Sequence, residues 1–239
     1  MSSSVSSKPP RAAARSARSD RPSRPEGGRP PAHPAAPAGR GEVRIIGGQW
    51  KRSRLPVPDS PGLRPTPDRV RETLFNWLGQ DLRGWQVLDA YAGSGALGFE
   101  AASRGAAEVT LLEQQPALVA ALNRHRERLG ATMLRIERAD ALDWMQRAEP
   151  GRYQLVLLDP PFAAGLVPAS LQAARPLLAP GGLIYLESGE APGADELRAA
   201  GLSLHRQGRA GAVHYHLLVS CAADATPPTS SSHAARSSS

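Results

Sequence analysis

The sequence predicts an α/β protein with a mostly parallel, seven-stranded sheet and an antiparallel hairpin at one edge. Three observations lead to this fold class. From residue 85 onward, short apolar segments alternate with helical patterns, as in a parallel sheet covered by helices on both faces. Four of these segments end in an acid, which marks one common rim of the sheet. The last two segments, 202–207 and 212–220, have no helix between them and predict the hairpin.

The predicted domain covers residues 43–220 and lies between two tails. Residues 1–42 are mostly Ser, Pro, Ala, Arg and Gly, and residues 221–239 have a similar composition. Such segments bury too little apolar surface to offset the entropy of ordering, so both are expected to be disordered. The leader holds eight Lys or Arg against three acids, which suits either a contact with phosphate backbones or a solubilising role. It has some likeness to an organelle transit peptide but lacks an apolar helical face.

Cysteine content and hydropathy exclude several classes of protein. Cys221 is the single cysteine, which rules out an internal disulfide and a multi-cysteine zinc site and fits a reducing compartment. No apolar run approaches the roughly 18 residues of a membrane span, and no signal-peptide core follows the N-terminus.

A basic hairpin is expected at the start of the domain. The segment "VRIIGGQWKRSRL" alternates and is broken by two glycines, which favours a short hairpin. Its cations surround Trp50: Arg44, Lys51, Arg52 and Arg54. Cations beside an aromatic ring suit a nucleic-acid contact, although an ordinary exposed strand has the same pattern.

A helix follows within "RPTPDRVRETLFNWLGQ". Thr66 is expected to cap it, with Pro67 in the first turn and Asp68 at the positive end of the helix dipole. An apolar face recurs at helical spacing through Val70, Leu74, Trp77 and Leu78. Gly79 or Gly84 is expected to end the helix.

Strand–turn–helix units occupy the remainder of the domain. The expected strands are 85–89, 108–113, 134–140, 153–159 and 183–188, followed by the two strands of the hairpin. Helices are expected after the Gly-rich turn up to Gly105, and at 116–130, 141–148 and 165–182. The first four strands end in Asp89, Glu113, Asp140 and Asp159. Because ligands bind outside the carboxyl ends of such strands, these acids are expected to line one site.

The turn "GSGALG", residues 93–98, indicates a nucleotide-containing cofactor. Gly93 and Gly95 permit a tight turn and close approach of the backbone to a ligand. Glu113 is placed for the hydroxyls of a ribose, in S-adenosylmethionine or in a dinucleotide. Asp89 favours S-adenosylmethionine, since a carboxylate suits the amino group of its methionine part better than a pyrophosphate. Asp140 could accept from an adenine amino group or simply cap the next helix.

The segment "VLLDPPF", residues 156–162, places a carboxylate, a stiff turn and an aromatic ring after a core strand. Methyl transfer to an exocyclic amine of a base needs two acceptors near the nitrogen. The Asp159 carboxylate and the Pro160 carbonyl could be those acceptors, and Phe162 could stack on a base taken out of its helix. The catalysis would then be positioning and electrostatics. The alternative is a proline turn with a core phenylalanine.

The order of these motifs resembles the RsmD-type methyltransferases, which modify guanine N2 in bacterial 16S ribosomal RNA. The resemblance rests on "GLRPTPDRVRETLFNWL", "VLDAYAGSGALGFEA", "LLE" and "VLLDPPF" and covers residues 43–219. It implies a Rossmann-like, seven-stranded methyltransferase sheet with S-adenosylmethionine as donor. It also implies a cytoplasmic, metal-free monomer whose partner is 16S ribosomal RNA or a small-subunit assembly intermediate.

The resemblance further implies the roles of single residues. The cofactor would be held by Asp89, Gly93, Ser94, Gly95, Glu113, Asp140 and Ala141. The target base would be held by Asp159, Pro160 and Phe162. The substrate side would be formed by Arg64, Thr66 and Arg71. From their own sequence pattern, the hairpin cations Lys51, Arg52 and Arg54 are expected to clamp the RNA. Tyr91 stands where the family usually has Phe, which keeps the ring.

Other readings remain open at this point. The acceptors suit adenine N6 as well as guanine N2, in DNA or RNA. Only about 60 ordered residues are expected after Phe162, too few for a separate DNA-recognition domain, which favours RNA. A non-enzymatic RNA-binding assembly factor and a dinucleotide-dependent oxidoreductase are the remaining alternatives.

The histidines and tryptophans are given structural roles. His214 and His216 alternate on a strand but have no third ligand nearby, so an exposed strand face is expected rather than a metal site. His125 lies on an Arg-rich helix and is expected to be solvated. Trp77 and Trp85 are expected in the core.

Overall fold

A computed structural model describes residues 41–58, 66–161 and 165–221. The chain divides into two units, Met1–Ala38 and Gly39–Ser239, and all described residues belong to the second. The predictions for the leader and most of the C-terminal tail therefore lie outside the described residues, as do those for Arg64 and Phe162. Where the structure describes the chain, no helix has both the length and the apolar character needed to cross a bilayer.

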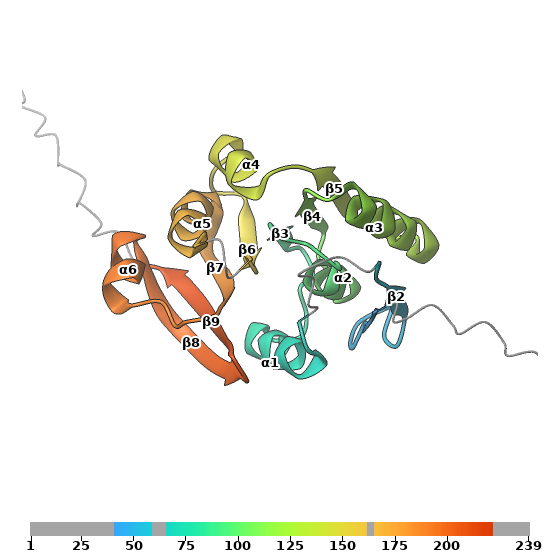
Figure 1. The fold of residues 1–239 in the computed structure, drawn as a ribbon, viewed down its shortest axis with the longest axis horizontal. Coiled ribbons are helices and arrows are strands. Elements are labelled where there is room, and N and C mark those ends of the chain that lie inside the picture. The colour runs from blue at the N-terminus through green and yellow to red at the C-terminus, as the bar shows by residue number, and fades with distance from the viewer. Residues whose placement is uncertain (1–40, 59–65, 162–164, 222–239) are drawn as a thin grey trace, which may run out of the picture. The chain divides into compact units, whose positions relative to one another are not determined.

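The main sheet has seven strands: β3 (Gln86–Asp89), β4 (Glu108–Glu113), β5 (Leu134–Arg138), β6 (Tyr153–Leu158), β7 (Leu178–Ser188), β8 (Leu202–Ala210) and β9 (Val213–Ser220). Their order is β5-β4-β3-β6-β7-β9-β8. The first five in this order are parallel, and β9 pairs antiparallel with both β7 and β8 (Figure 1). The predicted fold class is thereby confirmed. The strand order reverses between β3 and β6, where open α/β sheets bind ligands.

Helices cover both faces of the sheet (Figure 1). One face carries α1 (Asp68–Leu78), α2 (Ala96–Ser103) and α3 (Pro116–Leu129), and the other carries α4 (Ala141–Arg147), α5 (Val167–Ala174) and α6 (Ala194–Ala199). A short 3-10 helix, Arg175–Leu177, follows α5. Alternate strand residues feed two hydrophobic clusters: Val87 packs with Leu74 and Phe99 on the first face, and Leu88 packs with Met145 on the second.

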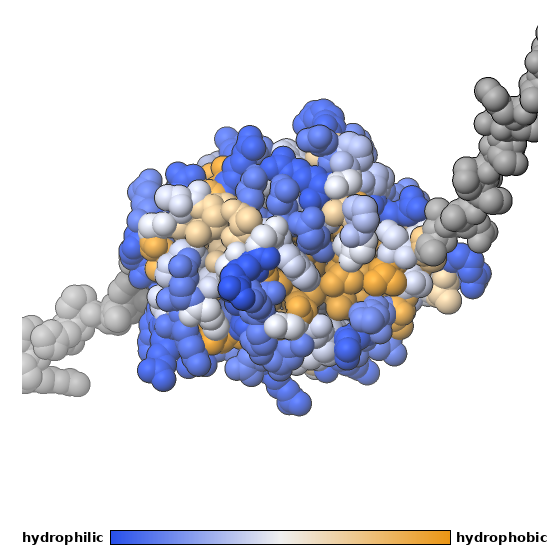
Figure 2. All heavy atoms as spheres, turned by 180° about the vertical axis from the view of Figure 1, so that it is seen from behind, coloured by the Kyte–Doolittle hydropathy of each residue, from blue (hydrophilic) through white to orange (hydrophobic). Residues whose placement is uncertain are grey.

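The two hydrophobic clusters contain nearly all large apolar side chains that the structure describes. Among the described large apolar residues, Leu204 on the outer strand β8 is exposed, at 44% relative exposure. Figure 2 shows a mainly hydrophilic surface on the side away from the viewer of Figure 1, with a limited hydrophobic area. Trp77 and Trp85 are partly buried against the first cluster, in agreement with their expected place in the core.

The N-terminal hairpin forms a separate small sheet. Strands β1 (Glu42–Arg44) and β2 (Arg54–Pro56) pair antiparallel, as the sequence predicts. The hairpin packs on α3, where the His125 ring nitrogen bonds the Pro56 carbonyl at 2.9 Å. It also packs on α2, where the Gln49 amide donates to the Ser103 carbonyl at 2.8 Å.

Three local expectations are wrong. Thr66 does not cap α1, whose N-cap is Pro67 with no side-chain bond, because the Thr66 hydroxyl bonds the carboxylate of Glu187 instead. His125 is buried rather than solvated, because the hairpin covers it. His216 is buried as well, at 2% exposure, because it lies opposite Leu186 on the face that packs into the second hydrophobic cluster. The expected end of α1 is confirmed: Gly79 has a left-handed φ of 90°.

Candidate active site

Four acids gather on one face of the sheet at the carboxyl ends of its central strands. Asp89 on β3 lies opposite Leu111 on β4 and Leu157 on β6. Opposite residues of parallel strands point to the same face, and so do residues two apart along one strand. The face that holds Asp89 therefore also receives Glu113, two residues beyond Leu111, and Asp159, two beyond Leu157. Glu187 on β7 joins them, because Leu158 pairs with Leu186. We call Asp89, Glu113, Asp159 and Glu187 the acid cluster.

Asp89, at the end of β3, is more deeply buried than Glu113, at the end of β4. It is 2% exposed. Burial, together with the charges of Glu113 and Glu187, raises its pKa to about 7. The Gly98 amide donates to its Oδ2 at 2.9 Å, which partly offsets this rise in pKa. A positive charge near this carboxyl group would therefore favour its ionised form.

Asp159 and Glu187 are neighbours at the carboxyl ends of β6 and β7. Burial raises the pKa of Asp159 well above its ordinary value, and the charges of Glu187 and Asp89 raise it further. Burial also raises the pKa of Glu187. The hydroxyls of Tyr185 and Thr66 and the nearby guanidinium of Arg71 lower it in part. Asp159 therefore lies near Asp89 and Glu187, within the acid cluster.

The Gly-rich turn is tied to the acid cluster by Glu113. The Gly93 amide donates to one carboxylate oxygen of Glu113 at 2.9 Å, and the Gln115 amide donates to the other at 2.8 Å. Gly93 and Gly95 have left-handed φ values of 50° and 79°. A Cβ on Gly95 would lie 2.6 Å from Leu122 Cδ2, so the turn has no room for a side chain there. Glycine at this position lets the turn pack closely on the core at the start of α2.

Asp140 lies farther along the rim, at the start of α4. Its Oδ1 accepts from the Asp143 amide at 2.9 Å, which is a helix cap, and its Oδ2 accepts from Gln114. Ala141 is buried beside it, and Ser94 is buried in the Gly-rich turn. The structure gives Asp140 its capping role; contact with an adenine stays a prediction.

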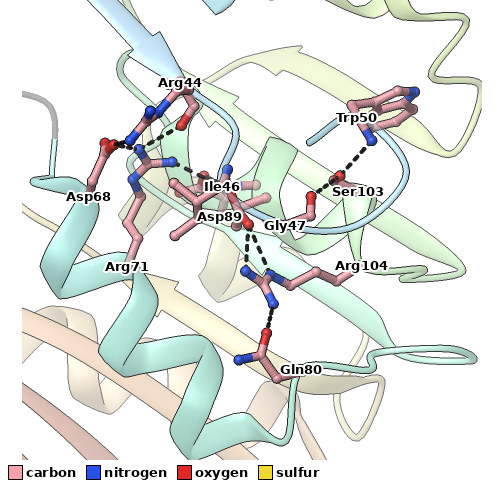
Figure 3. Close-up of polar contacts among 12 residues, drawn as sticks. Arg44, Ile46, Gly47, Trp50, Asp68, Arg71, Gln80, Asp89, Ser103 and Arg104 are labelled. Carbon is pink, nitrogen blue, oxygen red and sulfur yellow. Dashed lines mark hydrogen bonds and ion pairs between the residues drawn. The ribbon is translucent and has the colours of Figure 1, made fainter. Parts of the chain in front are cut away.

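Arg71 is buried rather than exposed toward a substrate. It is 1% exposed, and its guanidinium lies 2.6 Å from Asp68 and 3.5 Å from Glu100, and donates to the Arg44 carbonyl at 2.8 Å. Figure 3 shows Arg71 between α1 and the hairpin, beside Arg44 and Asp68. Its contacts join elements of the protein, so any effect on a substrate would be indirect, through residues such as Glu187.

The hairpin cations have a different setting. Lys51 and Arg52 are exposed, and Arg54 is exposed while paired with Glu42 at 2.9 Å. Contact of these side chains with a nucleic acid stays a prediction. Pro160 is buried after Asp159, whereas Phe162 and Arg64 lie in the segments outside the description.

Two acids of this region were missed from the sequence. Glu187 is the last residue but one of β7, the fifth parallel strand, so the same rule that selected the other strand ends could have found it. Glu100 sits in the Ala-rich helix α2, where a lone carboxylate among apolar residues was the signal. It is fully buried, receives the Ile46 amide at 2.9 Å and pairs with Arg104 at 2.7 Å.

The site suits an organic cation. Within 41–58, 66–161 and 165–221, no group of three or more His, Cys, Asp or Glu side chains is arranged to hold a metal ion. The acid cluster nevertheless places four carboxyl groups near the Gly-rich turn. A positive charge bound beside these carboxyl groups would favour their ionised forms.

Comparison with known proteins shows the family to which the chain belongs. The family model described as conserved hypothetical protein 95 matches residues 43–219. Ribosomal RNA small subunit methyltransferase D of Escherichia coli K12 is 46% identical over 183 residues, covering 75% of this chain and 91% of that protein. The protein of the same name from Haemophilus influenzae is 42% identical over 157 residues, covering 64% and 81%.

Solved structures show the same relationship. The Escherichia coli protein yhhF has 42% identity and a TM-score of 0.66, covering 74% of this chain and 97% of that one. A Thermus thermophilus protein, TTHA0928, has 31% identity and a TM-score of 0.59, covering 73% and 98%. The chain therefore belongs to the family of conserved hypothetical protein 95, the RsmD-type ribosomal RNA methyltransferases.

Proposed function

We propose that this protein transfers a methyl group from S-adenosylmethionine to the exocyclic N2 of a guanine in 16S ribosomal RNA. One observation carries the proposal: Asp159 of the Asp-Pro-Pro turn lies in the buried acid cluster beside the Gly-rich turn. Relatives named as small-subunit ribosomal RNA methyltransferases support the choice of RNA. The free RNA or a small-subunit assembly intermediate would be the partner.

The described residues fit S-adenosylmethionine. Gly93 and Gly95 give the turn its left-handed backbone. Glu113 would accept from the ribose hydroxyls, and Asp89 would accept from the amino group. When bound, the cofactor supplies a methyl group on a positively charged sulfur. A cation at this place favours the ionised forms of Asp89 and Asp159, which burial otherwise disfavours.

Asp159 and Pro160 then act on the target amine. The Asp159 carboxylate and the Pro160 carbonyl accept hydrogen bonds from the NH2 group and aim its lone pair at the methyl carbon. Methylation of the amine would release a proton from the nitrogen, and Asp159 would receive it. Phe162 would stack on the base, a role that remains a prediction from the sequence.

Calorimetry with S-adenosylmethionine, and separately with NADH, is the first test. Binding of S-adenosylmethionine alone is expected. Binding of NADH alone would support a dinucleotide enzyme, and RNA binding without either cofactor would support an assembly factor.

Methylation of 16S RNA and of small-subunit particles, followed by mass mapping, is the second test. Methylated guanine is expected, and methylated adenine would contradict the proposal.

Asp159→Ala is expected to abolish transfer while leaving the melting temperature within a few degrees of the wild type. Full transfer by a folded Asp159→Ala variant would also overturn the mechanism.

A further inference from the structure

Glu187 lies where the edge of the target base would be read. It follows Leu186, the partner of Leu158 in the β6–β7 pair, so its carboxylate lies across from Asp159, one strand spacing away. Neighbouring strands are about 4.8 Å apart, so carboxylates at the ends of β6 and β7 can approach one base together. The negative charges of Glu187 and Asp159 act on each other, as expected for side chains on the same face.

The Glu187 carboxylate is held in one orientation. The Tyr185 hydroxyl donates to its Oε1 at 2.9 Å, and the Thr66 hydroxyl bonds the same carboxylate. The guanidinium of Arg71, itself fixed by Asp68 and Glu100, is the cation that acts on it. Burial raises the pKa of Glu187 overall, and these three groups act in the opposite direction, toward the ionised carboxylate. An ionised carboxylate can only accept hydrogen bonds.

Purine bases differ in what they offer to such a pair. Guanine presents two neighbouring donors, the N1–H and the N2 amino group. Adenine presents its N6 amino group beside N1, which is an acceptor. Two adjacent carboxylates therefore complement guanine, whereas a carboxylate facing adenine N1 would set two acceptors against each other.

We propose that Glu187 selects guanine by accepting its N1–H, while Asp159 accepts from the N2 amino group. Tyr185 and Thr66 are positioning residues, since they act through the Glu187 carboxylate. The inference rests on the proposed function, because it assumes that a base is bound at Asp159. It adds a residue outside the Asp-Pro-Pro-Phe motif that decides between the two purines.

The test uses RNA in which the mapped target guanine is replaced by 2-aminopurine. This base keeps the N2 amino group but has an acceptor at N1. Wild-type kcat/KM is expected to be about 10- to 100-fold lower on 2-aminopurine, since a hydrogen bond to a charged group is lost. Glu187→Gln is expected to lose about 10- to 100-fold on guanine but not on 2-aminopurine, because a Gln amide can donate to N1.

Glu190→Gln is the matched control, since Glu190 is an exposed carboxylate three residues later. Its ratio of guanine to 2-aminopurine activity is expected to equal that of the wild type. An equal loss on both bases in Glu187→Gln would overturn the inference, because it would mean that Glu187 only supports Asp159. If the wild type methylates no guanine at all, the proposed function fails instead.

A second variant keeps the inference testable if Glu187→Gln does not fold. Tyr185→Phe retains the Glu187 charge but removes the hydroxyl that orients it. Its ratio of guanine to 2-aminopurine activity is expected to fall at least severalfold. A ratio equal to that of the wild type in the folded Tyr185→Phe variant would count against a carboxylate held for base selection.

Discussion

At the scale of single residues, Asp89 shows how position alters the chemistry of a side chain. In the unfolded chain its pKa is near 3.8, and in the folded protein burial raises it to about 7. Between these values the folded protein keeps a proton that the unfolded chain has released. The stability that Asp89 contributes is therefore complete below about pH 4 and is lost as the pH rises through 7.

We predict that the melting temperature of the cofactor-free protein falls from pH 5 to pH 8, and that Asp89→Asn reduces this fall. The asparagine cannot ionise, and its amide oxygen can still accept from Gly98. Differential scanning calorimetry gives the pH dependence of the melting temperature for both proteins. The contributions of other titrating groups cancel when the two are compared. Identical slopes for the two proteins would contradict the raised pKa.

Gly95 shows the steric requirement of the cofactor turn. Its φ is 79°, and a Cβ would lie 2.6 Å from Leu122 and 2.8 Å from Phe99. We predict that Gly95→Ala lowers the free energy of unfolding by about 2–5 kcal/mol, the sum of a left-handed backbone and overpacking. Calorimetry is also expected to show weaker S-adenosylmethionine binding.

Gly211→Ala is the control for this substitution. Gly211 has a similar φ of 62° but open space around its Cβ position. It is expected to lose only the backbone part, about 1–3 kcal/mol, and to bind the cofactor normally. Equal effects of both changes, measured by chemical denaturation, would remove the steric argument.

At the scale of elements, a buried ionic network holds the hairpin, α1 and α2 together. Glu100 on α2 pairs with Arg104 and Arg71 and accepts the Ile46 amide of the hairpin. Arg104 also lies over the Phe75 ring at 4.6 Å and bonds Gln80 (Figure 3). Because Arg71 also acts on Glu187, this network connects the hairpin to the acid cluster.

We predict that Glu100→Ala lowers the free energy of unfolding by about 3–5 kcal/mol, since two buried guanidinium groups would lose their shared carboxylate. Urea denaturation measures the change. Asp195→Ala removes an exposed carboxylate paired with Arg198 and is expected to have little effect. A Glu100→Ala variant as stable as Asp195→Ala would show that the network does not hold these elements.

Secondary structure was predictable where periodicity was strong. The parallel strands, the final hairpin and helices α1 to α5 follow from alternating apolar patterns. Helix α6, only six residues long, had no such pattern and was missed. The burial of His125 and His216 was also missed, because it depends on the hairpin and on strand order, neither of which local sequence reports.

At the scale of the whole molecule, the site lies where the strand order reverses between β3 and β6. The right-handed connections of a parallel sheet bring strand ends from distant parts of the sequence to one rim. Asp89 and Glu187, almost a hundred residues apart, consequently act on each other's ionisation. The charge of the site is therefore a property of the sheet rather than of a motif.

We predict that removal of residues 1–40 leaves the melting temperature of the protein nearly unchanged. The composition of this leader, rich in Ser, Pro, Ala and Arg, offers little apolar surface to bury. Calorimetry of the full and shortened chains makes the comparison. A decrease of several degrees would show that the leader contributes to folding.

The sequence alone determined the α/β class, the Gly-rich turn, the strand-end acids and the Asp-Pro-Pro turn, because these depend on local periodicity, glycine conformation and proline geometry. Only the tertiary structure decided that Glu187 joins Asp159, that Arg71 is buried against Glu100, and that Thr66 bonds a carboxylate instead of capping a helix. These contacts join residues far apart in the chain. Strand order and packing bring such residues together, and no local pattern encodes which of them meet.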